Sequence, residues 1–253
     1  MKIGLANMPF YYLLLYFAFG ILPSLIWLLY YLAKDLHPEP KRMILEVFLL
    51  GMLSTIPVFF LQLGLSFMLK GFYFLYLPPL LIEIIKWFVV IAFTEELFKY
   101  LVVRLTLFKS KELDEPLDIM LYMVVAALGF AALENILYLF SPVENIISFG
   151  AIARTTITVS FIRFIGATFL HTLSSALLGY FLALSSIRGI KGVKFTLLGI
   201  LLATLLHGWY NFSIMVLSYP LNVVFPVVTV LALVVFMIYD FNEIKKIKSI
   251  CKI

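Results

Sequence analysis

The sequence has few charged residues for its length. Asp, Glu, Lys and Arg make up 13% of its 253 residues, about half of the roughly 25% found in an average globular domain. Hydrophobic residues make up 64%, whereas globular domains average roughly 45–50%, and a soluble domain cannot bury so much apolar surface. The composition therefore excludes a soluble enzyme, a disordered tail and a nucleic-acid-binding domain, and it indicates that a lipid bilayer surrounds most of the chain.

Cysteine is almost absent as well. Cys251 is the only cysteine, which excludes a disulfide framework and any metal site built from several thiolates. It is the third residue from the C-terminus, whereas a prenylation box begins with its cysteine in fourth place. The first apolar run, 10–33, has no charged residue and is longer than the roughly 7–15 residues of a signal-peptide core. We therefore interpret this run as a retained membrane-spanning helix.

Seven apolar runs are long enough to cross a bilayer. A spanning helix needs about 20 mainly apolar residues, and charges, glycines and prolines divide the chain into the runs 10–33, 43–69, about 84–108, 118–140, 164–186, 195–217 and 221–239. They predict an all-α, polytopic transmembrane helix bundle, with 1–253 as a single integral-membrane domain. Segment 143–163 is apolar but has Arg154 at its centre, so we interpret it as interfacial or re-entrant, with an eighth span as the alternative.

The distribution of basic residues predicts the orientation, because lysine and arginine favour the cytoplasmic side. With the N-terminus outside, the cytoplasmic segments contain thirteen basic residues and the outer segments contain four, namely Lys2, Lys70, Arg154 and Arg163. Lys86 and Lys99 lie in or beside the third run. This asymmetry predicts an outer N-terminus and a cytoplasmic C-terminus.

Four of the predicted spans carry ionisable side chains, some with a carboxamide close by, away from the ends of the apolar run. Such residues are costly in the hydrocarbon core, so they mark candidate functional sites by default. They are Glu95, Glu96 and Lys99 in the third span, Glu134 and Asn135 in the fourth, His171 in the fifth, and His207 and Asn211 in the sixth. At 1.5 Å per residue, Glu95, Glu134 and the two histidines lie roughly 9–15 Å from the outer ends of their spans. The common depth predicts one cavity within a motif-bearing core of about 84–217.

These residues also have purely structural interpretations. Glu95 and Lys99 are about 40° apart around a helix, a spacing that suits a buried ion pair that only fixes helix packing. A single buried histidine often makes an interhelical hydrogen bond, and Asn135 and Asn211 can do the same. Glu134 has no basic partner on its own span, and the shared depth of four spans favours a functional site.

The residue types suit hydrolysis of an amide bond. A lysine close to a carboxylate favours the ionised form of that carboxylate. Glu95 or Glu96 beside Lys99 is therefore a candidate general base toward water. Imidazole and carboxamide groups can donate hydrogen bonds to a developing oxyanion, which assigns a role to the histidines and asparagines.

A zinc site is the alternative. Glu134, His171 and His207 would form a ligand set of two histidines and one carboxylate, with an open position for water. No H-E-x-x-H signature is present, so this interpretation depends on the predicted geometry alone. The spacing of Glu95 and Lys99 favours the metal-free base, and we expect no cofactor, with zinc as the alternative.

The order and spacing of these residues resemble a known family. Its pattern here is Glu95-Glu96-x-x-Lys99, Phe130-x-x-x-Glu134-Asn135, His171 and His207-x-x-x-Asn211. These look like the four motifs of the PrsW intramembrane proteases, which are bacterial and archaeal relatives of the CAAX prenyl-protease and bacteriocin-immunity superfamily. The resemblance covers about 94–211 and implies a multi-pass peptidase of a prokaryotic plasma membrane. It also implies that Glu95 is the base, supported by Glu96 and Lys99, and that the remaining motif residues polarise the carbonyl or hold a metal: Glu134, His171, His207 and Asn211.

The resemblance further implies the kind of substrate. The family's type member makes the first cut in an anti-sigma factor on the extracytoplasmic side, so we expect a membrane-anchored protein or peptide as the substrate. Two other classes remain as alternatives, a proton- or ion-coupled transporter, since buried Glu and His also relay protons, and a non-catalytic membrane scaffold. A polar pocket open laterally to lipid favours the protease, whereas a continuous polar path across the bundle favours transport.

Overall fold

The structure is a computed structural model that describes residues 10–33, 38–72, 77–107, 115–140, 149–188 and 192–244, and these contain helices and no strand. The elements are α1 (Phe10–Leu32), α2 (Lys41–Phe72), α3 (Pro79–Ile84), η3 (Ile85–Phe93), α4 (Thr94–Thr106), α5 (Pro116–Leu139), α6 (Phe149–Ile165), α7 (Ala167–Arg188), α8 (Val193–Val216) and α9 (Leu221–Ile244). The prediction of an all-α polytopic bundle is confirmed.

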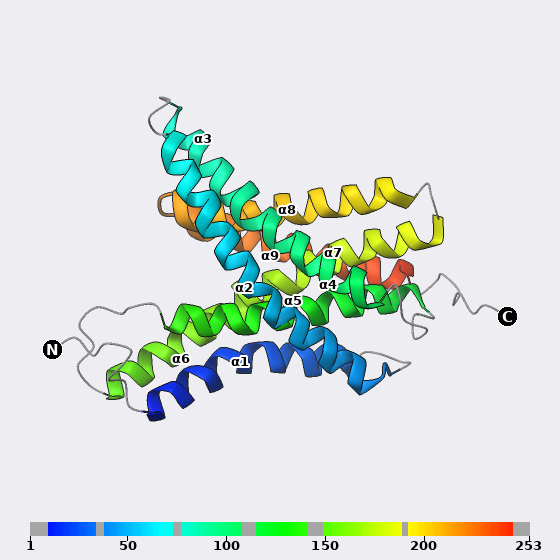
Figure 1. The fold of residues 1–253 in the computed structure, drawn as a ribbon, viewed down its shortest axis with the longest axis horizontal. Coiled ribbons are helices and arrows are strands. Elements are labelled where there is room, and N and C mark those ends of the chain that lie inside the picture. The colour runs from blue at the N-terminus through cyan, green and yellow to red at the C-terminus, as the bar shows by residue number, and fades with distance from the viewer. Residues whose placement is uncertain are drawn as a thin grey trace.

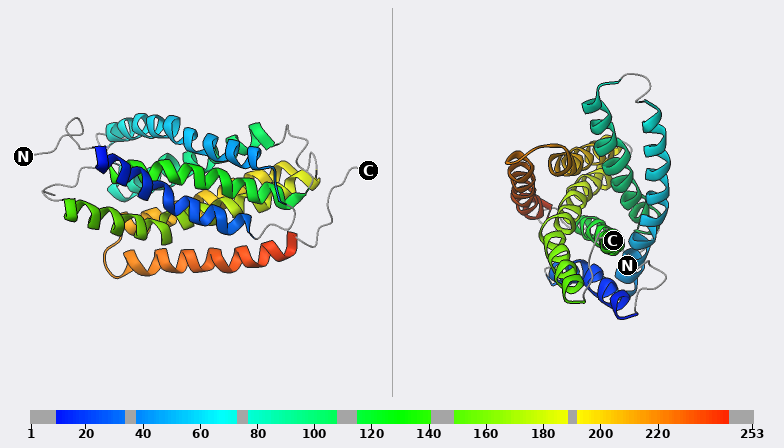
Figure 2. Two further views of the ribbon diagram at one scale, coloured as in Figure 1. Left: turned by 90° about the horizontal axis from the view of Figure 1, so that it is seen from below. Right: turned by 90° about the vertical axis from the view of Figure 1, so that its left-hand side faces the viewer.

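The described helices join into seven rods, of which α2 and the rod formed by α3, η3 and α4 cross the others at an angle (Figures 1 and 2). α3, η3 and α4 follow one another without a break, and only Gly166 separates α6 from α7. Five stretches are long and apolar enough to cross a membrane as continuous helices: Phe10–Leu32, Lys41–Gly71, Pro116–Leu139, Gly150–Ser186 and Val193–Val216. The third rod is divided by η3, and α9 is apolar over Leu221–Met237.

The described part of segment 143–163 is the helix α6, which is not re-entrant, and its interfacial location stays a prediction. α6 lies alongside α1, where the Ser160 hydroxyl donates to the Phe19 carbonyl at 2.7 Å and the Trp27 indole donates to the Phe164 carbonyl at 3.1 Å. Because α6 then continues into α7, the two helices form one rod and not an additional crossing. Residues 141–148 lie outside the described part of the chain.

α5 is the central helix of the bundle. In its most apolar stretch of 18 residues, 83% of the residues are buried, against 28% in the corresponding stretch of α1. α5 packs against α1, α2 and α7. Glycines allow this close approach, because a Cβ on Gly129 would lie 2.0 Å from the Phe48 carbonyl oxygen, and one on Gly51 would lie 2.3 Å from the Ala126 carbonyl oxygen. Small residues at helix contacts are typical of membrane bundles.

η3 is a π-helix of nine residues that directly precedes the acidic motif. π-Helical turns are rare in proteins, and those that occur often lie at functional sites. The Thr94 hydroxyl donates to the Val90 carbonyl at 2.6 Å, where the chain returns to the α-helical pattern. The third rod begins at Pro79 and not at about residue 84, so Glu95 lies farther from the start of its helix than predicted.

Candidate active site

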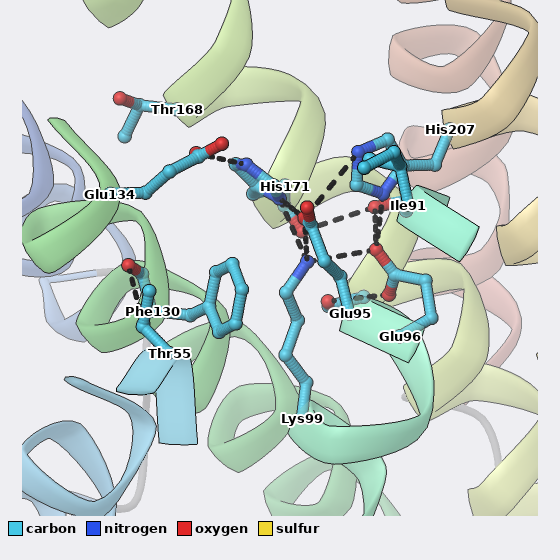
Figure 3. Close-up of polar contacts among 12 residues, drawn as sticks. Thr55, Ile91, Glu95, Glu96, Lys99, Phe130, Glu134, Thr168, His171 and His207 are labelled. Carbon is cyan, nitrogen blue, oxygen red and sulfur yellow. Dashed lines mark hydrogen bonds and ion pairs between the residues drawn. The ribbon is translucent and has the colours of Figure 1, made fainter. Parts of the chain in front are cut away.

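Glu95 presents one carboxylate oxygen to two histidines. Its Oε1 accepts a hydrogen bond from Gln62 Nε2 at 3.2 Å, whereas its buried Oε2 has no hydrogen-bond partner among the described residues. Oε2 lies 3.9 Å from His171 Nδ1 and 3.7 Å from His207 Nε2. The histidine rings meet edge to face with their centroids 4.9 Å apart. We call Glu95, His171 and His207 the ligand cluster (Figure 3).

Glu96 is fully buried behind this cluster. Its carboxylate accepts hydrogen bonds from Ser174 and Ser175, each at 3.1 Å, and lies 2.8 Å from His207 Nδ1. Lys99 Nζ is 2.9 Å from Glu96 but 3.9 Å from Glu95. The predicted pairing of Lys99 with Glu95 is therefore present, but Glu96 is the closer partner.

Lys99 also contacts the second histidine. Its Nζ lies 2.7 Å from His171 Nδ1 and 4.8 Å from the centre of the Phe130 ring. An ammonium group can only donate, so His171 Nδ1 accepts in this contact. His171 Nε2 then carries the hydrogen and donates to Glu134 Oε2 at 2.9 Å.

Glu134 belongs to an ion pair with Arg163, which the sequence placed only in an outer segment and not in the site. Arg163 Nη2 donates to Glu134 Oε2 at 2.7 Å, and its Nε donates to Asn135 Oδ1. Asn135 in turn donates to the Thr168 hydroxyl at 3.0 Å. Arg163 lies on α6, which brings its side chain, 9% exposed, against Glu134 on α5.

The ligand cluster corrects the proposed metal set. Ligand atoms of its three residues all lie within 4.8 Å of one another, and among the described residues this is the group of His, Asp and Glu that could hold a metal ion. Sequence analysis chose Glu134 as the carboxylate, but Glu134 binds the far nitrogen of His171, whereas the buried Oε2 of Glu95 faces both rings. Two imidazoles and one carboxylate fit zinc, which takes such a set with an open position.

Each histidine has one ring nitrogen held by a carboxylate outside the cluster. Glu96 holds Nδ1 of His207, and Glu134 holds Nε2 of His171. The other nitrogen of each ring faces Glu95 Oε2. Carboxylates that orient the histidines in this way are characteristic of protein metal sites.

A cavity of about 550 Å³ adjoins the cluster. Its polar wall is formed by Thr55, Gln62, Glu95, Glu134, Arg163, His171, His207 and Asn211. Its apolar lining includes residues that are 41–62% exposed on the outside of the bundle: Phe59, Leu137, Tyr138, Ile162 and Met215. The cavity is therefore accessible from the lipid-facing surface. Glu96, Lys99 and Asn135 do not line it and lie buried behind the wall.

On the other side of the acidic motif the bundle is filled by apolar side chains. Val103, Leu107, Met123 and Leu128 belong to one core cluster and are fully buried. They lie between the site and the end of the bundle at which α4 ends and α5 begins. A polar pocket with an apolar rim and a filled apolar base favours a protease over a transporter.

Two of the site residues that were not predicted from the sequence are Gln62 and Arg163. Gln62 is the only carboxamide in the apolar run 43–69. A single polar side chain in such a run could have indicated that Gln62 belongs to the site. Arg163 lies three residues before the helix break at Gly166, and no periodicity distinguished it from a boundary residue.

A helix bundle that surrounds a buried pair of histidines and a carboxylate beside a lipid-accessible cavity defines a membrane-embedded hydrolase. Comparison with known proteins agrees. Residues 39–239 match the family model of the PrsW family intramembrane metalloproteases. The chain is 33% identical to Protease PrsW of Oceanobacillus iheyensis over 193 residues, which cover 76% of this chain and 80% of that protein.

Other relatives give the same result. Protease PrsW of Bacillus subtilis is 30% identical over 79% of this chain and 82% of its own length, and Protease PrsW of Geobacillus kaustophilus is 31% identical over 78% of each. No solved structure matches. The chain belongs to the PrsW family, and it is a multi-pass membrane protease. This confirms the resemblance found in the four motifs.

Proposed function

We propose that this protease hydrolyses a peptide bond with the help of one zinc ion held by the ligand cluster, Glu95, His171 and His207. The observation that carries the proposal is the buried Glu95 Oε2, which faces one nitrogen of each histidine while a separate carboxylate holds the opposite nitrogen. The family's description as metalloproteases supports a metal. A bound zinc ion supplies a Lewis acid and a water that is nucleophilic near neutral pH.

The other residues of the site have separate roles in this proposal. Glu96 orients His207, and Glu134 orients His171, through the hydrogen bonds described above. Asn211 lines the cavity one helical turn from His207, and its carboxamide is suited to donate a hydrogen bond to the carbonyl oxygen as negative charge develops there. Lys99 compensates the charge of Glu96 in a region without water access.

The substrate that we propose is a membrane-anchored protein, of the anti-sigma-factor kind that the motif resemblance implies. The exposed apolar rim of the cavity suits a segment that arrives from the lipid. The cavity wall carries carboxylate, imidazole and carboxamide groups close to this rim, so that the backbone of such a segment would meet polar partners once it enters.

The contact between Lys99 and His171 supports a second candidate mechanism, without metal. Lys99 donates to the same His171 nitrogen that a metal would take, so the two cations compete for it. In the metal-free mechanism Glu95 Oε2 takes the proton from water, and the histidines stabilise the oxyanion.

Cleavage assays with a chelator separate the two mechanisms. The full-length protein is purified in detergent without added metal, and cleavage of a membrane-anchored substrate is followed before and after chelation and after zinc is returned. We expect reversible loss of activity, and we expect His171→Ala and His207→Ala to lose both zinc and cleavage. Asn211→Ala is the control, which should keep zinc but cleave roughly 10²–10³-fold more slowly. Full activity in the chelator would support the metal-free mechanism instead.

A further inference from the structure

Gln62 is the side chain by which α2 reaches the ligand cluster. Its Nε2 lies 3.2 Å from Glu95 Oε1 and 3.3 Å from the Thr94 hydroxyl oxygen. It comes from a lipid-facing part of α2, where the neighbouring Phe60 and Leu63 are 66% and 52% exposed. A polar side chain at such a position is costly unless it has partners in the protein, and these two contacts supply them.

The partners determine how the carboxamide is oriented. A carboxylate oxygen can only accept, so the amide nitrogen of Gln62 must face Glu95. The Thr94 hydroxyl hydrogen is used toward the Val90 carbonyl at 2.6 Å, so its oxygen is free to accept from Gln62. Both contacts require the same orientation, and the end of the π-helix η3 therefore serves as a fixed support for Gln62.

The hydrogen bond from Gln62 to Oε1 also determines where the other oxygen of Glu95, Oε2, points. A carboxylate that is held at neither oxygen can rotate about its terminal torsion, which has a broad distribution. Gln62 is the hydrogen-bond partner of Oε1, and with Oε1 held, Oε2 faces the two histidine nitrogens at 3.9 and 3.7 Å. The ligand cluster is thus assembled by four rods, since Gln62 adds α2 to the helices α4, α7 and α8 that carry its members.

We propose that Gln62 is a positioning residue that sets the metal affinity of the ligand cluster by fixing the rotation of the Glu95 carboxylate. This inference rests on the proposed function, because it takes Glu95 as a metal ligand. Groups that hydrogen-bond to metal ligands typically change metal affinity by 10–100-fold when they are removed. Gln62 belongs to this class of residue, although it lies on a helix whose sequence otherwise indicates only membrane contact.

The test compares zinc affinity in two variants of α2. Gln62→Met keeps the length of the side chain and removes both hydrogen bonds. Ser54→Ala is the matched control, because Ser54 is also a buried polar residue of α2, with its hydroxyl donating to the Gly51 carbonyl at 2.7 Å, but it does not line the cavity. Zinc binding to the full-length protein is measured by competition with a chelator, alongside thermal unfolding and cleavage kinetics. We expect 10–100-fold weaker zinc binding in Gln62→Met and a change of less than about twofold in the control.

Other results of these measurements would separate the positioning role of Gln62 from the proposed function. Equal zinc affinity of folded Gln62→Met and wild type would overturn the positioning role and leave the proposed function intact. Absence of zinc binding in the wild type would overturn both. If Gln62→Met does not fold, Gln62→Asn retains the amide in α2 but is one methylene group shorter, and it should bind zinc more weakly while unfolding at the wild-type temperature. A purely structural role would instead lower the unfolding temperature and leave zinc affinity and kcat unchanged.

Discussion

At the scale of single residues, Lys99 places a fully buried positive charge beside the ligand cluster. Its ammonium group contacts Glu96 and the His171 nitrogen that faces Glu95. A buried lysine without charged partners is strongly unfavourable, and Glu96 provides the compensation. Lys99 therefore stabilises the arrangement of the acidic motif while it competes with a metal ion for His171.

This competition predicts that Lys99→Met binds zinc more tightly. Removal of one positive charge near a divalent cation and release of His171 Nδ1 should raise the affinity by about tenfold, which corresponds to about 1.4 kcal/mol. The same change leaves Glu96 with only neutral partners, so the unfolding temperature should fall. Chelator competition and thermal unfolding of the purified variant measure the two effects. Weaker zinc binding would show that Lys99 helps to assemble the ligands and does not compete with the metal.

Arg163 gives a second prediction at this scale. Arg163→Met removes the positive partner of Glu134 and the link from α6 to Asn135. Loss of one partner of a buried ion pair destabilises by roughly 3–5 kcal/mol, and we expect the lower end because the Glu134 side chain is 21% exposed. Arg154→Met on the same helix is the control, since Arg154 is exposed. Equal unfolding temperatures of the two variants would contradict a structural contribution of the Arg163–Glu134 pair.

At the scale of elements, the contact between α2 and α5 positions the cavity wall that carries Gln62 and Glu134. The two helices meet through glycines, so their spacing depends on the absence of a side chain. At Gly129 a Cβ would lie 2.0 Å from a backbone oxygen, which cannot move away as a flexible side chain could. Gly64 lies on α2, and a Cβ added to it would have nothing within 4 Å.

These two glycines form a matched pair of substitutions. Gly129→Ala should push α2 and α5 apart and destabilise by roughly 1–3 kcal/mol or more, as overpacking of a core does. Gly64→Ala should stabilise by about 0.5–1 kcal/mol, because alanine favours a helix interior over glycine. Thermal unfolding in detergent measures both effects. A neutral Gly129→Ala would mean that the helices pack less closely than the structure indicates.

At the scale of the whole molecule, the number of rods and the gathering of four motifs could be predicted from sequence, because they depend on apolar length and on the cost of buried charge. Contacts between rods could not. The contacts of Gln62 and Arg163 depend on how helices are rotated and broken, and η3 and the break at Gly166 have no periodic signature. For the same reason the sequence did not indicate that Glu95, and not Glu134, faces the ring nitrogens of both histidines.

The orientation of the bundle is still a prediction, and Cys251 offers a direct test. As the only cysteine, it should react with a membrane-impermeant maleimide only after cells are permeabilised, because the basic residues favour a cytoplasmic C-terminus. A Lys2→Cys change, made together with Cys251→Ser, should react in intact cells. The reverse pattern of labelling would invert the topology and place the cavity toward the cytoplasm.

The central claim is that Glu95, His171 and His207 bind one zinc ion, and anomalous diffraction at the zinc absorption edge tests it most directly. We predict a single anomalous peak among these three side chains in crystals of the full-length protein, with zinc–nitrogen distances of about 2.0–2.1 Å and a zinc–oxygen distance of about 2.0–2.2 Å. Crystals of an active protein without a peak at this position, or with a peak that Glu95 does not coordinate, would contradict the claim.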